Sequence, residues 1–122
     1  VTEELVRRQR TERTWGMVTD TGQPVGFLGY LPITRETGML HGISVTRLVQ
    51  GTGCDGHCLD EMLVELARDG VRKVSASYFS DNLRVRRFLS KHGFVVVGLL
   101  VDQTRRQGVL TSMHLVARMV GG

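Results

Sequence analysis

A change in apolar periodicity near the middle of the chain constrains the fold more than any other feature. From Cys54 onward, apolar side chains recur with the spacing of one helical face, and Gly70 marks the end of that pattern. Residues 39–49 before it and 71–79 after it have the composition of strands, and Gly42 predicts a bulge or a close backbone approach. A strand, a helix and a second strand form a crossover, so we expect two parallel, neighbouring strands.

Further helices and strands are expected on both sides of this crossover. A second amphipathic helix follows a candidate cap at Ser80 or Asp81. We also expect a polar helix at residues 2–13 and a hairpin at 14–31. A closing hairpin is expected at 94–119, with its turn at 102–108. The order is helix, three strands, helix, strand, helix and two strands, which predicts an α+β or mixed α/β fold with a mixed sheet.

Length and composition limit the classes of function. The chain has 122 residues, the size of one domain, so we expect a single domain over residues 1–122. It lacks an apolar run of about 18 residues, so no membrane-spanning helix is expected. The net charge is +4 and most of the basic residues are arginine, which suits recognition of phosphates and carboxylates. Because the chain has few aromatic residues and no RNA-module signature, a small anionic ligand is favoured over nucleic acid.

Two cysteines and a histidine within five positions suggest a metal. Cys54, His57 and Cys58 would lie close together in the helix. A structural zinc site needs four ligands, however, and the other histidines fall in different predicted elements. We therefore predict no metal, with Cys58 acting as a small apolar side chain and both thiols reduced, as is typical of the cytoplasm.

The stretch Gln50-Gly51-Thr52-Gly53 joins the strand at 39–49 to the helix. Glycines let the backbone approach a ligand closely, and the first turn of a helix offers unpaired N–H groups to an anion. The stretch is neither a Walker loop nor a dinucleotide fingerprint. Taken alone, such glycines more often form an ordinary turn.

Two motifs in the expected order resemble the GCN5-related N-acetyltransferase (GNAT) family. The family motif Gln/Arg-x-x-Gly-x-Gly/Ala matches residues 50–55, between a strand and a helix. A later family signature matches residues 76–98 at these positions: Asn82, Arg87, Phe88, Lys91, Gly93 and Phe94.

The resemblance implies an acyl-CoA N-acyltransferase fold in which two parallel strands splay apart. It also implies acetyl-CoA, or another acyl-CoA, as the co-substrate, with its pantetheine arm in the wedge and its diphosphate on the turn. The implied contacts are with Ile43, Ser44, Val45, Gln50, Gly51, Thr52, Gly53, Cys54, Asp55 and Asn82. Arg47 and Arg84 are nearby cations that could meet the phosphates.

The implied reaction is direct attack of a deprotonated amine on the thioester. The amine proton must pass to a base or to water. His41 is the candidate base because histidine titrates near neutral pH, although a single histidine on a strand is more often structural. The implied acceptor is a small-molecule or peptide amine.

The sequence departs from the family pattern at three points. Asp55 holds the last motif position, where Gly or Ala is expected, and places a carboxylate near the expected phosphates. Leu89 stands where the family often has a tyrosine that protonates the departing thiolate. The family's first strand and the helices that shape the acceptor pocket are expected to be short or missing. A non-catalytic acyl-CoA-binding or regulatory module therefore stays open as an alternative function.

Partners and location follow from the same features. We expect no nucleic acid and no membrane as a partner, and a cytoplasmic location. The long closing hairpin at 94–119 is a candidate edge for a homodimer.

Overall fold

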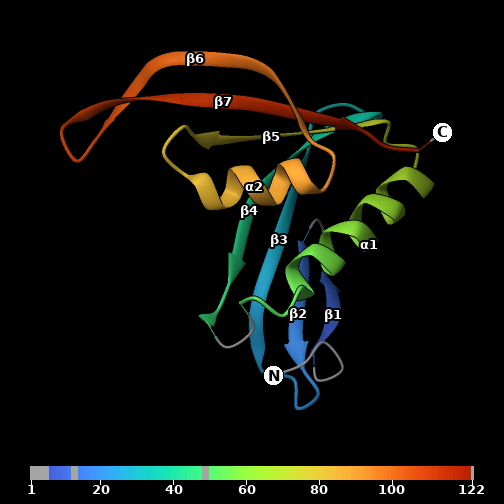
Figure 1. Cartoon of the computed structure of the whole chain (residues 1–122). Coiled ribbons are helices and arrows are strands. Elements are labelled where there is room, and N and C mark those ends of the chain that lie inside the picture. The colour runs from blue at the N-terminus through green and yellow to red at the C-terminus, as the bar shows by residue number, and fades with distance from the viewer. Residues whose placement is uncertain (1–5, 12–13, 48–49, 122) are drawn as a thin grey trace.

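A computed structural model describes residues 6–11, 14–47 and 50–121 of the chain. They form one mixed sheet of seven strands in the order β1-β2-β3-β4-β5-β7-β6, with two helices (Figure 1). In chain order the elements are β1 Val6–Thr11, β2 Thr14–Thr19, β3 Pro24–Pro32, β4 Thr37–Val45, α1 Cys54–Arg68, β5 Lys73–Phe79, α2 Leu83–Lys91, β6 Val95–Arg106 and β7 Val109–Met119. The predicted fold class is confirmed, and β4 and β5 are parallel neighbours joined through α1.

The helix predicted at residues 2–13 is wrong. Within this segment the structure has the strand β1, which pairs antiparallel with β2. Val6 lies opposite Thr19 at one end of the pair, and Thr11 lies opposite Thr14 at the other. Residues 1–5 and 12–13 lie outside the described residues. The segment carries no apolar helical face, so pairing with the adjacent strand β2, rather than local propensity, decides its conformation. A strand therefore precedes β2, and only two residues separate them, too few for a helix.

Both helices follow the periodicity of the sequence. Helix α1 begins at Cys54 and buries the predicted apolar stripe, as expected. Helix α2 is capped by Asn82, whose Oδ1 accepts the Val85 N–H at 3.3 Å, so the predicted cap at Ser80 or Asp81 is wrong. An Asn oxygen that satisfies an unpaired N–H of the first turn is a favourable cap. This cap has a functional consequence, because it places Asn82 at the mouth of the site described below.

The apolar core lies on one face of the sheet, beneath both helices. Trp15 on β2 is fully buried and its indole N–H donates to the Glu65 carboxylate on α1. The helices also contact each other, since a Cβ at Gly56 on α1 would come within 2.7 Å of the His92 ring at the end of α2. On the opposite face of the sheet, Phe27 and Leu31 of β3 are exposed. Within the described residues, no helix covers that second face.

The closing hairpin is longer than predicted. Its strands run to Arg106 and from Val109, so the turn is at Gln107–Gly108 and the predicted turn at residues 102–108 is wrong. Strand β7 lies between β5 and β6, which leaves β6 as an edge strand. The register of β6 shifts between Leu100 and Thr104, where Asp102 has a φ of 49°. A bulge therefore lets the hairpin continue past the residues that looked like a turn.

Candidate active site

Strands β4 and β5 pair over three residue pairs and then separate. The last pair is Met39 with Ser75, after which β4 continues to Val45 with no backbone partner on β5. A cavity of about 440 Å³ opens where the two strands diverge. It is lined by Met39, Leu40, His41, Gly42, Ile43, Ala76, Ser77, Tyr78, Phe79, Asn82, Val85, Leu89 and Met113. The predicted splay of the parallel strands is therefore present in the structure.

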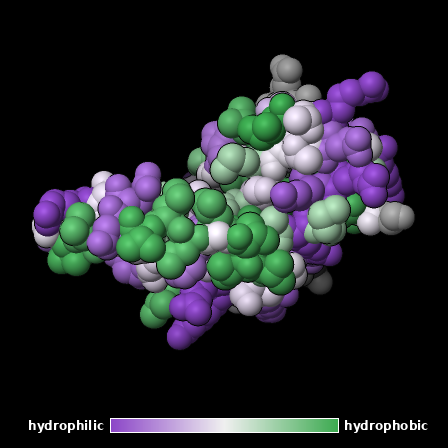
Figure 2. Space-filling model, turned by 90° about the horizontal axis from the view of Figure 1, so that it is seen from above, coloured by the Kyte–Doolittle hydropathy of each residue, from purple (hydrophilic) through white to green (hydrophobic). Residues whose placement is uncertain are grey.

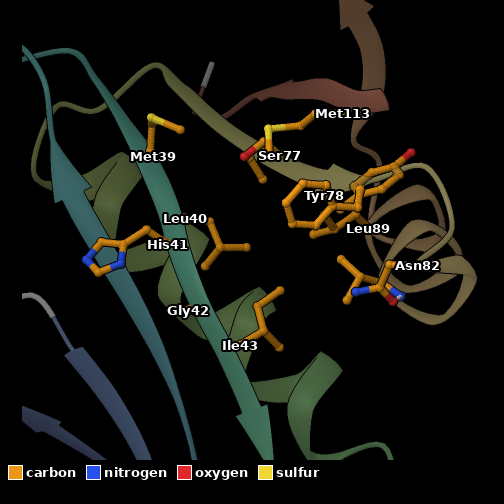
Figure 3. A pocket seen from close by; sticks show the side chains of 13 residues that line it. Met39, Leu40, His41, Gly42, Ile43, Ser77, Tyr78, Asn82, Leu89 and Met113 are labelled. Atoms are coloured by element: carbon orange, nitrogen blue, oxygen red, sulfur yellow. Dashed lines mark hydrogen bonds between the residues drawn. The ribbon is translucent and has the colours of Figure 1, made fainter. Parts of the chain in front are cut away.

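A bulge in β4 determines which side chains enter this cavity. Two residues of β4, His41 and Gly42, lie opposite the single Gly29 of β3, and Gly42 has a φ of 119°. The bulge predicted at Gly42 is confirmed. In Figure 3, Leu40 and Ile43 point toward the cavity, whereas the His41 ring lies on the other side of β4. The predicted base is thus exposed at the rim of the cavity and does not point into it.

A second cavity, of about 330 Å³, extends the first toward the beginning of α1. The two cavities share Ile43, Asn82 and Val85 as walls, so together they form one groove between β4 and α2. Of the ten residues predicted to bind the co-substrate, five line this second cavity: Ile43, Ser44, Val45, Asp55 and Asn82. The other five form the turn that leads into α1.

That turn has the backbone shape of an anion cradle. Gly51 and Gly53 have φ values of 80° and 84°, which residues with a side chain rarely adopt. Within the described residues, no acceptor is found for the N–H groups of these two glycines. Gln50 supports the turn by donating from Nε2 to the Val45 carbonyl at 3.3 Å. The turn leads directly into the first turn of α1, where unpaired N–H groups and the positive end of the helix dipole favour an anion.

Charged groups of both signs lie at the mouth of the second cavity. The Asp55 carboxylate is half-buried, and its Oδ1 accepts the Gly56 N–H at 2.9 Å. It therefore occupies one donor of the first helical turn that an anion could otherwise use. Arg84 lines the same cavity, as its predicted role requires. Arg47 is exposed and lines neither cavity.

Candidates for protonating a departing thiolate are poorly placed. Leu89 is buried, lines the first cavity and has no proton to give. Ser90, one residue further, is exposed and is not part of the lining. The Tyr78 ring borders the cavity, but its hydroxyl points away from β4 (Figure 3).

The sequence did not predict Met113 as a residue of the site. Pairing of β7 with β5 brings it there, and no local pattern marks it.

The cysteines and histidine that suggested a metal are engaged otherwise. Cys54 and Cys58 are buried free thiols, and the exposed His57 ring lies 3.1 Å from the Glu61 carboxylate. No group of three or more His, Cys, Asp or Glu side chains in the described part of the chain is arranged to hold a metal ion.

Among the same residues, neither helix has the length and apolarity needed to cross a membrane.

Comparison with solved structures gives the same fold. The chain superposes on the ribosomal-protein-S18-alanine N-acetyltransferase from Escherichia coli with a TM-score of 0.80 at 16% identity, covering 93% of this chain and 73% of that one. A GNAT family acetyltransferase from Elizabethkingia anophelis, solved with acetyl-CoA bound, gives 0.76 at 16% identity, covering 88% and 75%. An IAA acetyltransferase from Bacillus cereus gives 0.75 at 18% identity, covering 89% and 79%.

Sequence comparison identifies the family. None of the curated proteins compared matches the chain. The family model described as "Acetyltransferase (GNAT) family" matches residues 2–94, which is more than half of the chain and includes the splayed strands, the glycine turn and α2. The chain therefore belongs to the GNAT family of acetyltransferases.

Proposed function

We propose that this protein transfers an acetyl or other acyl group from coenzyme A to an amine by direct attack. The observation that carries the proposal is the groove along β4, which begins beside Asp55 in the first turn of α1 and ends in the cavity beyond Met39 and Ser75. A long thioester needs an anion site at one end and a narrow apolar passage at the other, and the groove offers both in that order.

The chain's own residues would hold the co-substrate along this groove. The backbone N–H groups of Gln50 to Asp55 would receive the diphosphate, with Arg84 as a counter-charge at the same mouth. The backbone of β4 from Ile43 to Val45, unpaired on the β5 side, would pair with the amides of the pantetheine arm. Asn82 would position that arm, because it lines both cavities while its Oδ1 caps α2.

Catalysis would rest mainly on positioning. The bound thioester supplies a carbonyl carbon that a deprotonated amine can attack, and holding the two reactants together replaces a bimolecular encounter. Two routes are open for the amine proton: His41 at the rim of the cavity, or water that enters beside it. Because Leu89 cannot donate a proton, the thiolate would leave without help from that position.

The acceptor amine would approach from the face of the sheet that carries His41 and Met39. Solved structures of this fold include one named for an alanine of ribosomal protein S18 and one named for IAA, so both a peptide and a small molecule remain compatible acceptors. We further propose that residues 1–122 act as one domain, in the cytoplasm, without a metal, a membrane or a nucleic acid as a partner.

A non-catalytic acyl-CoA-binding module is the second candidate. Asp55 in the cradle and Leu89 at the expected proton donor favour it, because the first weakens binding and the second removes acid catalysis. Both candidates share the groove and differ only in turnover.

Two measurements separate these outcomes. Titration calorimetry with acetyl-CoA should give saturable heat with one site per chain; no binding by folded protein would refute both candidates. Thiol release should then be followed with a panel of amines that includes peptide amino termini and small primary amines. Steady turnover with any member would eliminate the non-catalytic module, whereas binding without turnover across the panel would favour it.

A further inference from the structure

The first half of β6 is an uncovered apolar strand. Residues Val95–Val101, here called the β6 segment, read VVVGLLV and contain no charged side chain. Its six valines and leucines are between 39% and 67% exposed, although β6 is paired with β7 along one side. Seen from above, hydrophobic side chains gather along this part of the molecule (Figure 2). A long, exposed and apolar edge strand without charges is a site for association with another chain.

The second half of the hairpin also lacks support. The last residue pair between β5 and β7 is Phe79 with Met113, and beyond it β6 and β7 continue as a ribbon of two strands. Val109 and Leu110 on this ribbon are 64% and 47% exposed. A two-stranded ribbon is at best marginally stable in water unless something packs against it. Residues 79–81 hold the ribbon: Arg106 pairs with Asp81 at 2.9 Å and lies 4.4 Å from the Phe79 ring, and Ser80 donates two hydrogen bonds to the Ser112 carbonyl.

The total surface is larger than that of a compact monomer of this size. The accessible surface is 7663 Å² for a mass of 13.6 kDa. A compact monomer of that mass is expected to expose about 6,600 Å², which leaves an excess of roughly 1,000 Å². A standard protein–protein interface buries about 800 Å² on each partner. The excess is therefore sufficient for one stable interface, and the β6–β7 hairpin projects beyond the rest of the sheet (Figure 1).

We propose that the β6 segment packs against the same segment of a second copy of this chain, across a two-fold axis. In such a contact the same surface serves both partners, so the segment must be complementary to itself. Centred on Gly98, an antiparallel arrangement places Val95 opposite Val101 and Val96 opposite Leu100, apolar against apolar throughout. Because the β6 segment has no charged side chain, two copies of it can meet without repulsion between like charges, although each chain carries a net charge of +4.

Side-chain packing, rather than a continuous ladder of backbone hydrogen bonds, would form most of this interface. The register of β6 shifts at Val97, between Val96 and Gly98, and again before Thr104. Such bulges interrupt strand pairing and limit the growth of long aggregates. They leave the valine and leucine side chains free to interdigitate. A closed dimer is therefore expected, and not an extended assembly.

The first experiment measures mass in solution. Light scattering on the purified protein should give a dimer at tens of micromolar. Val97→Lys should shift it to a monomer, with a dimer dissociation constant raised at least tenfold, because two like charges would be buried near the axis. The matched control is Val64→Lys, since Val64 is 50% exposed on α1 and lies outside the β6 segment; it should remain a dimer.

A second experiment locates the axis and does not depend on the lysine variant. Val97→Cys should be joined to its own copy by a short bismaleimide, whereas Thr104→Cys, further along the same exposed strand, should not. A wild-type monomer at these concentrations would overturn the proposal. So would a Val97→Lys dimer, cross-linking of both cysteine variants alike, or a monomer that instead binds phosphatidylglycerol vesicles through this segment. Acetyl-CoA titration of the same samples tests the proposed function separately, because none of these substitutions lies in the groove.

Discussion

Met39 on β4 and Ser75 on β5 are the last residues through which the two parallel strands pair. Beyond them the sheet opens into a cavity whose walls come from β4, β5, β7 and α2. Beyond this pair, the backbone of β4 has no partner on β5.

The glycine turn should bind the co-substrate through its backbone shape. Gly51 has a φ of 80° and its missing Cβ has no neighbour within 4 Å, so Gly51→Ala should introduce backbone strain alone, of about 1–2 kcal/mol. Relaxing that strain turns the N–H groups away from the anion. We expect the dissociation constant for acetyl-CoA to rise about tenfold, measured by calorimetry.

Gly22→Ala is the matched control for that strain. Gly22 lies in the β2–β3 turn with a φ of 86° and is equally free of neighbours. It should lower the melting temperature about as much as Gly51→Ala and leave acetyl-CoA affinity unchanged. Equal affinities of the two variants would show that the turn takes no part in binding.

Asp55 should weaken the binding of an anion at the beginning of α1. Its carboxylate lines the second cavity and accepts the Gly56 N–H. Asp55→Asn keeps the shape and removes the charge, so acetyl-CoA should bind about fivefold more tightly, equivalent to ~1 kcal/mol. The melting temperature should fall slightly, because a negative charge in the first turn stabilises a helix.

A control for this substitution is Asp69→Asn, which makes the same charge change at the far end of α1. It should not alter the affinity. Weaker binding by Asp55→Asn would mean that the carboxylate contacts the ligand favourably, for example through an amide or hydroxyl of coenzyme A.

His41 should matter for turnover and not for co-substrate binding. If it takes the amine proton, His41→Ala should reduce kcat about 100-fold, the lower end of the range for general base catalysis. The dissociation constant for acetyl-CoA should stay the same, because the ring lies on the opposite side of β4 from Leu40 and Ile43 (Figure 3). The control His57→Ala, exposed on α1, should leave kcat unchanged. A change in kcat below threefold for His41→Ala would assign the proton to water.

Gly38 should be required for the packing beneath the cavity. A Cβ at Gly38 would come within 2.1 Å of the hydroxyl of Tyr30, a buried ring that cannot move aside freely. Gly38→Ala should therefore lower the free energy of unfolding by about 3 kcal/mol, measured by urea denaturation. Gly98→Ala is the control, because its nearest neighbour is the flexible Leu115 side chain at 3.3 Å, and it should cost less than about 1 kcal/mol.

Elements that depend on local chemistry were predictable from the sequence. The start of α1 at Cys54, its end before Gly70, the crossover between β4 and β5 and the bulge at Gly42 all follow from periodicity and from the conformations of glycine. The tight turn at Gly51 and Gly53 was recognisable for the same reason, since its φ values above zero favour residues without a Cβ.

Elements that depend on strand pairing rather than on local periodicity were not predictable. Residues 6–11 form a strand because β2 offers them a backbone to pair with, and β6 continues past Asp102 because β7 stays paired beyond the bulge. Likewise, the β4 bulge directs Leu40 and Ile43 into the cavity and His41 away from it. A shift of one residue reverses the face of every side chain that follows it. Gly42 predicted a bulge, but only the register of β4 with β3 decides which side chains turn toward the cavity.

The sequence by itself therefore determined the fold class and the two motifs of the GNAT family, because helix periodicity and glycine turns are short-range properties. Only the tertiary structure decided where β4 leaves β5, which side chains enter the cavity and which apolar strand remains uncovered. These are properties of strand pairing and register, which are set by contacts between segments far apart in the chain.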